Sequence, residues 1–171
     1  MKTLYLLRHA KSAWDDAGLA DHDRPLAPRG RKAAPRVGAY MKAHAMRPDL
    51  VIASTARRAA DTADLVLAAI GHAVPVEREH GLYLCGSHVL LERLRDAPDG
   101  VAALMLVAHN PDLHELATLL AGEGPPKALE SLRGKFPTAA CAVLGFDVVR
   151  WSEVQPGDGR LLDWILPRTL A

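Results

Sequence analysis

The sequence predicts an α/β fold in which helices cover both faces of a mainly parallel central sheet, giving three layers. Short apolar runs alternate along the chain with stretches long enough for helices, which is typical of strands joined by crossover helices. Such sheets are buried on both faces. With 171 residues, 49% of them apolar, the chain suits one domain over residues 1–171 with a sizeable core.

The first two thirds of the chain alternate regularly between the two kinds of element. We expect strands at residues 3–7, 50–53, 74–76 and 102–107, and helices at residues 29–45, 56–70, 87–96 and 113–121. Pro35 lies early in the first of these helices and cannot donate a backbone hydrogen bond. We therefore expect that helix to start late or to kink.

The last third opens on a cluster of glycines and prolines. Gly122, Gly124, Pro125 and Pro126 predict a loop over residues 122–137 with room for a short helix around Leu129. A further strand is expected at residues 139–146, and residues 148–154 are a candidate to pair with it. Residues 157–159 are typical of a turn, which leads into residues 160–166.

Composition narrows the possible partners and the compartment. The 21 Lys and Arg residues nearly balance the 20 Asp and Glu residues, so the formal charge of +1 gives no general attraction to nucleic acid or to a membrane surface. The apolar stretch at residues 4–7 is too short for a signal peptide, and no apolar run approaches the roughly 20 residues of a membrane span. Cys85 and Cys141 do not form a metal-ligand pair, and both suit a reducing cytoplasm. We predict a cytoplasmic protein; the sequence does not indicate its oligomeric state.

Metal binding is not predicted either. His22 is flanked by Asp21 and Asp23, but no second histidine or carboxylate cluster has the spacing of a first coordination shell with it. We therefore expect neither a metal nor another cofactor.

Two histidines follow two apolar runs, and this is the strongest functional signal in the sequence. Arg8 and His9 end the first predicted strand, His109 and Asn110 end the fourth, and Arg58 lies at the start of a predicted helix. The carboxyl ends of parallel strands meet at one edge of a sheet, where ligands collect. The sequence therefore predicts that two imidazoles and two guanidiniums converge there.

This combination suits phosphoryl transfer. A neutral imidazole can attack phosphorus, whereas a carboxylate nucleophile would be repelled by the charged phosphoryl group. Arginines stay ionised and bind phosphoryl oxygens with two parallel hydrogen bonds. We assign His9 as the nucleophile, Arg8 and Arg58 as phosphoryl ligands, and His109 as a third donor. Lys11 and Asn110 are further candidates for binding substrate.

The same residues resemble a known family. The motifs are Arg8-His9-Ala10, the segment STARRAADTA at residues 54–63, and His109-Asn110-Pro111, with further matches at residues 23–26, 82–83, 136–140 and 156–157. They are similar to the histidine phosphatase superfamily with its phosphoglycerate-mutase-like fold, and most similar to its SixA-type phosphohistidine phosphatases. The resemblance runs over nearly the whole chain. It implies that His9 becomes phosphorylated while Arg8, Arg58 and His109 bind the phosphoryl group; Arg57 fits the motif less well.

The sequence departs from the family pattern at two positions. Members that cleave alkyl phosphates carry a carboxylic general acid after the third strand, but residues 82–87 contain none and Leu84 stands about where it would be. Mutase-type members have an Asn after the Arg-His pair, where this chain has Asp15. Asp21, Glu77 or Glu79 remain candidates to supply an acid. Without one, a phosphoramidate is favoured over an alkyl ester, because its nitrogen takes a proton from solvent.

The sequence thus predicts a metal-independent phosphatase that forms a phosphohistidine intermediate and acts on phosphohistidine in a protein. No long insertion between His80 and Asp99 covers the site, which suits a protein substrate. A phosphomonoesterase for a small sugar or nucleotide phosphate is the alternative enzyme. A non-catalytic module that binds phosphorylated ligands is the alternative of another class. With His9 neutral and His109 protonated, we expect a bell-shaped rate profile around neutral pH.

Overall fold

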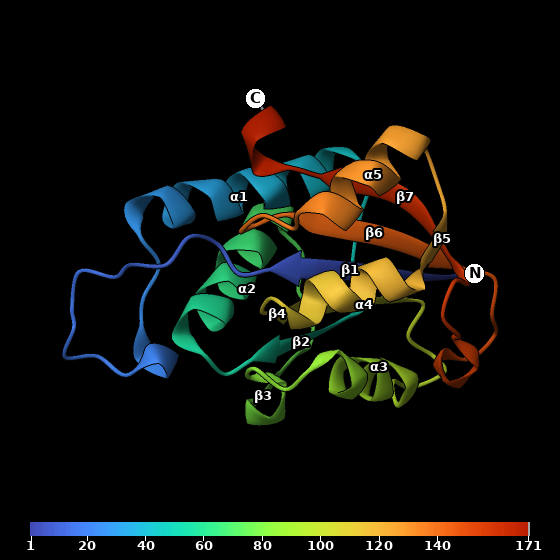
Figure 1. Ribbon diagram of the computed structural model, residues 1–171, viewed down its shortest axis with the longest axis horizontal. Helices are drawn as coiled ribbons and strands as arrows, with labels where there is room; N and C mark the ends of the chain where they lie inside the picture. Colours follow the sequence, from blue (N-terminus) through green and yellow to red (C-terminus); the bar gives the residue numbers. More distant parts are fainter. Residues whose placement is uncertain (171) are drawn as a thin grey trace.

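The computed structural model describes residues 1–170, in which one seven-stranded sheet carries helices on both faces (Figure 1). The strands are β1 (Lys2–Arg8), β2 (Leu50–Ser54), β3 (Val76–Glu79), β4 (Ala103–Ala108), β5 (Ala121–Glu123), β6 (Cys141–Phe146) and β7 (Gly159–Ile165). The α-helices are α1 (Pro28–Ala43), α2 (Arg57–Ile70), α3 (Ser87–Arg95), α4 (Asp112–Leu120) and α5 (Pro126–Gly134). The predicted three-layer α/β fold is confirmed.

The sheet is mixed but mostly parallel. Its strand order is β3-β2-β4-β1-β6-β7-β5. The first four strands in that order run parallel, whereas β6 is antiparallel to both β1 and β7, and the short β5 is parallel to β7. β4 lies between β1 and β2, so the carboxyl ends of these three strands are neighbours at one edge.

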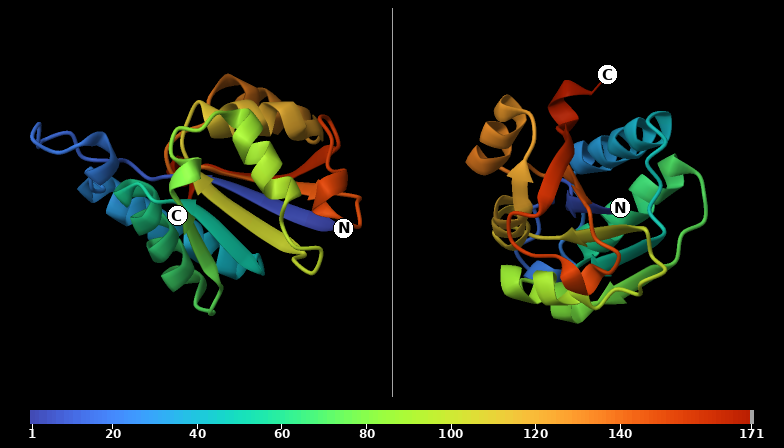
Figure 2. Two further views of the ribbon diagram at one scale, coloured as in Figure 1. Left: turned by 90° about the horizontal axis from the view of Figure 1, so that it is seen from below. Right: turned by 90° about the vertical axis from the view of Figure 1, so that its right-hand side faces the viewer.

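Alternation along β1 divides the core between the two faces of the sheet. Leu4 and Leu6 belong to a buried cluster that also contains leucines of α3, α4 and α5. Tyr5 and Leu7 belong to the opposite cluster, with apolar residues of α1 and α2. Figure 2 shows the resulting layers, with helices on both sides of the sheet. A rigid sheet of this kind can hold residues at its edge in fixed positions.

Several predicted boundaries are wrong. The third strand begins at Val76, later than expected, because this edge strand pairs with β2 alone and carries the charged residues Glu77, Arg78 and Glu79, which an apolar pattern cannot reveal. Helix α1 begins early, at Pro28, where a proline is well tolerated, and continues through Pro35. The late start predicted for it is therefore incorrect.

The last third differs from the prediction in one pairing. Residues 148–154 form no strand; residues Trp151–Glu153 form a short 3-10 helix instead. The Trp151 side chain is fully buried and its Nε1 donates to the Val101 carbonyl at 2.7 Å, while β7 takes the place beside β6. The short helix expected around Leu129 is confirmed as α5, and β5 was not predicted. Among the described residues, no helix has the length and apolar character needed to cross a bilayer.

Candidate active site

The backbone around His9 is fixed by three neighbouring elements. The N–H of Arg8 donates to the Ala140 carbonyl at 3.1 Å and that of His9 to the Ala108 carbonyl at 3.2 Å. The next N–H, of Ala10, donates to Thr62 Oγ1 at 2.9 Å. The segment that follows β1 is thereby attached to β4, to α2 and to the segment before β6.

Thr62 also connects this segment to the second arginine. Its hydroxyl donates to the Arg58 carbonyl at 2.6 Å, one helical turn earlier in α2. The Thr62 side chain therefore connects the segment that follows His9 to the helical turn that carries Arg58, which gives the spacing between Arg58 and Thr62 a physical reason. Arg57 points away: it is exposed and pairs with Asp61 at 3.6 Å.

The two candidate histidines lie side by side, with ring centroids 5.2 Å apart. His9 Nδ1 is 2.8 Å from the Ala10 carbonyl oxygen. A carbonyl only accepts hydrogen bonds, so Nδ1 carries the proton and Nε2 of a neutral His9 keeps its lone pair. This is the protonation state that a nucleophilic imidazole needs.

His109 is held by Ser54, at the end of β2. Ser54 Oγ accepts the N–H of Ala56 at 3.2 Å and lies 2.8 Å from His109 Nε2. When the Ser54 hydroxyl donates to Nε2, the proton of a neutral His109 is on Nδ1. Within residues 1–170 this Nδ1 is buried and has no hydrogen-bond partner.

Both imidazoles are strongly disfavoured in their charged form. Burial is the largest cause that lowers the pKa of His9 from 6.5 to about 4; the bond to Ala10 opposes this shift, and the nearby Arg58 and Arg8 charges act in the same direction as burial. Burial likewise lowers the pKa of His109 to about 3, with His9 and Arg58 adding to the effect. The free site therefore does not favour the protonated His109 expected from the sequence, whereas the bell-shaped rate profile stays a prediction.

The two arginines approach the histidines from different elements. Arg58 is only 3% exposed, and Arg8, at the end of β1, donates from Nη1 to the Phe136 carbonyl at 3.1 Å. The Nε atoms of both guanidiniums are buried and lack a partner among the described residues. Buried donors are normally satisfied, so these two unpartnered atoms are unusual within the protein.

Asp21 fixes the orientation of Arg58, a role that the sequence did not reveal. Arg58 Nη1 donates to the Asp21 carbonyl at 2.7 Å and Nη2 to its Oδ2 at 3.0 Å. The same carboxylate accepts from Arg24 Nε at 3.0 Å and from the Tyr83 hydroxyl. These bonds, with the Tyr83 bond the largest cause, hold the pKa of Asp21 well below its usual range. An ionised carboxylate with three donors is not a proton source.

All six candidate residues line one pocket of about 330 Å³: Arg8, His9, Lys11, Arg58, His109 and Asn110. The pocket walls also include Ser12, Trp14, Arg24, Leu84 and Thr138. Among these, Arg24 is 7% exposed and stacks on the Trp14 ring at 3.5 Å. Asn110 uses its Nδ2 to donate to the Phe136 carbonyl at 2.9 Å, so its amide positions the loop that also binds Arg8.

No carboxylate lines this pocket. Leu84 occupies its rim, 52% exposed, and Asp15 is exposed outside it. The other candidate acids are engaged elsewhere, because Glu77 and Glu79 both pair with Arg93 of α3 at 2.7 and 2.9 Å. Among residues 1–170, no group of three or more His, Cys, Asp or Glu side chains is placed to hold a metal ion.

Fold and pocket together define an α/β protein with two buried imidazoles and several guanidiniums around one pocket at the carboxyl edge of its sheet. Comparison with known proteins names the family. The family model of the histidine phosphatase superfamily (branch 1) matches residues 4–83. An uncharacterised protein of Mycobacterium tuberculosis is 39% identical over 164 residues, covering 95% of this chain and all of that protein. The chain belongs to the histidine phosphatase superfamily.

Solved structures agree with this assignment. A candidate SixA phosphohistidine phosphatase from Agrobacterium tumefaciens is 28% identical and superposes with a TM-score of 0.80, covering 97% of this chain and 98% of that one. The corresponding SixA candidate from Nakamurella multipartitia is also 28% identical, with a TM-score of 0.81 over 97% of this chain and 96% of that chain. Family and neighbours support phosphatase activity.

Proposed function

We propose that the chain is a phosphohistidine phosphatase that works through a phosphorylated His9. The lone pair on His9 Nε2 attacks phosphorus as the bond between phosphorus and the substrate nitrogen breaks, and that nitrogen leaves as a neutral imidazole after taking a proton from solvent. Water then attacks the phosphorylated His9; the new bond to oxygen replaces the bond to nitrogen, and inorganic phosphate and neutral His9 result.

The other residues of the pocket bind the group that is transferred. We assign Arg8 and Arg58, whose Nε atoms have no partner among the described residues, to bind the charge that develops on the phosphoryl oxygens, with His109 Nδ1 as a neutral donor beside them. The guanidiniums provide the positive charge that a bound metal provides in other phosphoryl-transfer sites, so we propose a reaction without a metal. Asp21 acts through Arg58 and is a positioning residue.

The observation that carries the choice of substrate is the pocket without a carboxylate. A positioned general acid contributes typically about 10²- to 10⁴-fold, or roughly 3 to 5 kcal/mol, to cleavage of a poor leaving group. An alkoxide needs this help, whereas the nitrogen of a phosphoramidate does not. SixA-like neighbours described as phosphohistidine phosphatases support the same choice. The free thiols Cys85 and Cys141 suit a reducing cytoplasm as the site of action.

Rates on phosphoramidate and on an alkyl phosphate, measured with the purified chain, test the proposal. We expect phosphoramidate to be hydrolysed at least about 100-fold faster, because the pocket lacks the general acid that the alkoxide leaving group needs and the phosphoramidate nitrogen does not. Rapid quenching is expected to trap an acid-labile, base-stable phosphoenzyme in the wild type and none in His9→Gln, with exposed His88→Gln as the matched control. Equal rates on both substrates would favour a phosphomonoesterase, and phosphate binding without a phosphoenzyme would favour a non-catalytic module.

A further inference from the structure

A second pocket adjoins the catalytic one. It has a volume of about 390 Å³ and shares Arg8, Lys11 and Thr138 with the pocket around His9. Its remaining wall comes from the first turns of α1, from the segment after α5 and from the chain end after β7. A molecule bound at His9 can therefore extend into it without crossing another element.

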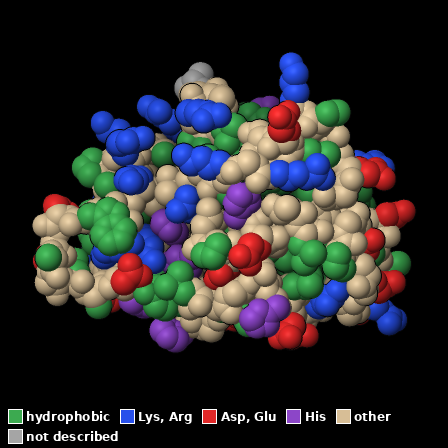
Figure 3. All heavy atoms as spheres, in the orientation of Figure 1, with side chains coloured by type: hydrophobic (Ala, Val, Ile, Leu, Met, Phe, Trp, Pro, Cys, Tyr) green, Lys and Arg blue, Asp and Glu red, His purple; other side chains and the backbone are tan. Residues whose placement is uncertain are grey.

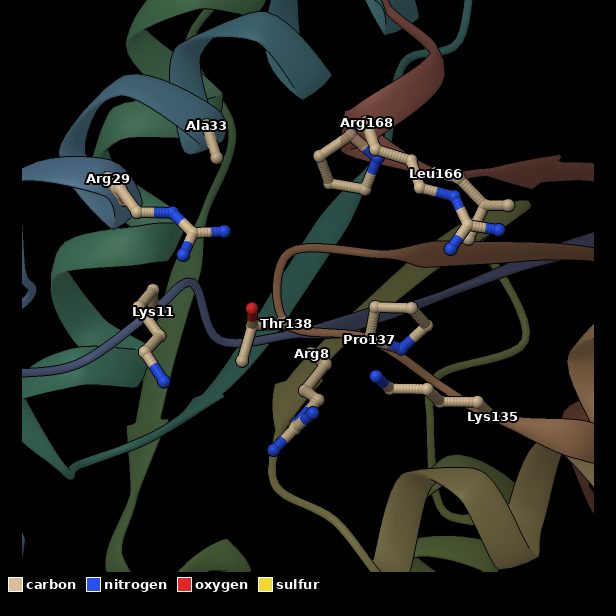
Figure 4. Close-up of a pocket in the computed structure, with 10 residues that line it drawn as sticks. Arg8, Lys11, Arg29, Ala33, Lys135, Pro137, Thr138, Leu166 and Arg168 are labelled. Atoms are coloured by element: carbon tan, nitrogen blue, oxygen red, sulfur yellow. The ribbon is translucent and has the colours of Figure 1, made fainter.

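The second pocket is lined by five cations and no carboxylate: Arg8, Lys11, Arg29, Lys135 and Arg168. Figure 4 shows Arg29 and Lys11 on one side of an open centre, with Lys135 and Arg168 on the other. Figure 3 shows Lys and Arg side chains gathered on the upper left of one face of the molecule. Among residues 1–170, none of the last four cations forms an ion pair.

Such a cluster is unusual in a chain whose formal charge is only +1. Like charges repel, so gathering them without acidic partners costs stability unless an anion binds. Arg29 adds to that cost, since it lies in the first turn of α1, where the helix dipole disfavours a cation. The second pocket therefore has the charge pattern of a binding surface.

The neutral part of the lining indicates which anion fits. Ala33, Pro137, Leu166 and Pro167 are apolar, and Thr138 is the one neutral polar side chain. A sugar or nucleotide needs several acceptors for its hydroxyls, which these side chains do not offer. Carboxylates carried on short aliphatic stems match both the cations and the apolar floor.

We propose that the second pocket docks an acidic segment of the phosphorylated protein, with glutamate or aspartate side chains close in space to the phosphohistidine that enters the catalytic pocket. This inference rests on the proposed function and extends it to the choice of protein substrate. Arg29, Lys135 and Arg168 bind the carboxylates, while Arg8 and Lys11 lie between the two pockets.

Peptide binding tests the inference independently of turnover. The probes are two peptides carrying a non-hydrolysable phosphohistidine analogue, one flanked by glutamates and one by glutamines. They are titrated into the wild-type chain, into the pocket variant R29Q/K135Q/R168Q and into the control variant K42Q/R47Q/K127Q. The control removes the same charge from exposed positions outside both pockets and outside any ion pair. Exposed ion pairs are individually weak, so we expect the pocket variant to bind the acidic peptide about 10-fold less tightly.

Other outcomes separate this inference from the proposed function. The glutamine peptide and the hydrolysis rate of phosphoramidate should change less than about 2-fold in either variant, because the catalytic pocket is intact. Equal wild-type affinity for the two peptides, or an equal loss in the control variant, would overturn the docking inference while leaving the phosphatase in place. A loss of affinity for inorganic pyrophosphate, with none for the acidic peptide, would assign the second pocket to a small molecule. Absence of a phosphoenzyme would refute the proposed function, whereas the difference in affinity between the two peptides would still test the docking inference.

Discussion

Acid should destabilise this protein through its two central histidines. In the folded chain His9 is 7% and His109 1% exposed, and their pKa values are lowered from 6.5 to about 4 and about 3. The unfolded chain therefore binds more protons than the folded chain below pH 6.5. By linkage, stability is highest above the unfolded pKa and falls as the pH decreases toward the folded pKa.

The size of the effect follows from the proton uptake. Between pH 7 and pH 5 each unfolded histidine gains about 0.7 of a proton while its folded counterpart stays mostly neutral, and integration over this interval gives about 2 kcal/mol per histidine. Together His9 and His109 should remove roughly 3 to 4 kcal/mol, a large part of the 5 to 15 kcal/mol typical of a domain. Asp21 does not contribute in this window, because its lowered pKa affects stability only near and below its unfolded value of 3.8.

Urea unfolding at pH 7, 6 and 5, followed by circular dichroism, measures this slope. His9→Gln should lose about half as much stability over the interval as the wild type, since one of the two buried groups no longer titrates. His88→Gln, at an exposed position, should keep the wild-type slope. A free energy of unfolding that stays constant from pH 7 to 5, or an unchanged slope in His9→Gln, would refute the assignment of two buried neutral imidazoles.

Two further predictions concern the support of the site. Asp21→Asn removes the negative charge that pairs with both Arg58 and Arg24, so kcat/KM for phosphoramidate should fall about 10-fold because the guanidiniums are misplaced. Asp23→Asn, at an exposed position, is the control and should have little effect. Equal losses for the two variants in steady-state assays would contradict the positioning role of Asp21. Gly30→Ala would place a Cβ in steric clash with the Lys11 carbonyl oxygen, so denaturant unfolding should show a loss of about 1 to 3 kcal/mol. Gly100→Ala, with open space around it, is the control, and an unchanged free energy of unfolding in Gly30→Ala would refute the clash.

The sequence was most informative where strands are buried on both faces. Continuous apolar runs located β1, β2 and β4, and parallel neighbours necessarily bring His9 and His109 to one edge. The edge strand β3 was misplaced because its residues are mostly charged, and the pairing of residues 148–154 failed because Trp151 packs into the core instead of extending a strand. Apolar patterns indicate which residues are buried, not which are in strands. β3 is a strand without being apolar, and Trp151 is buried without lying in a strand.

The charge arrangement of the site was the least predictable part, because it depends on contacts between distant segments. Asp21 and Arg58 are 37 positions apart, and nothing in either local sequence marks Asp21 as a ligand of arginine rather than a proton donor. Burial is the main cause of the lowered pKa of both imidazoles in the free site, and the surplus of guanidiniums adds to it. A bound phosphoryl group would offset that surplus, and so would favour protonation of the histidines that it contacts. In the proposed mechanism the arginines therefore add to burial in keeping His9 neutral before substrate arrives, and they bind the charge that His9 attacks.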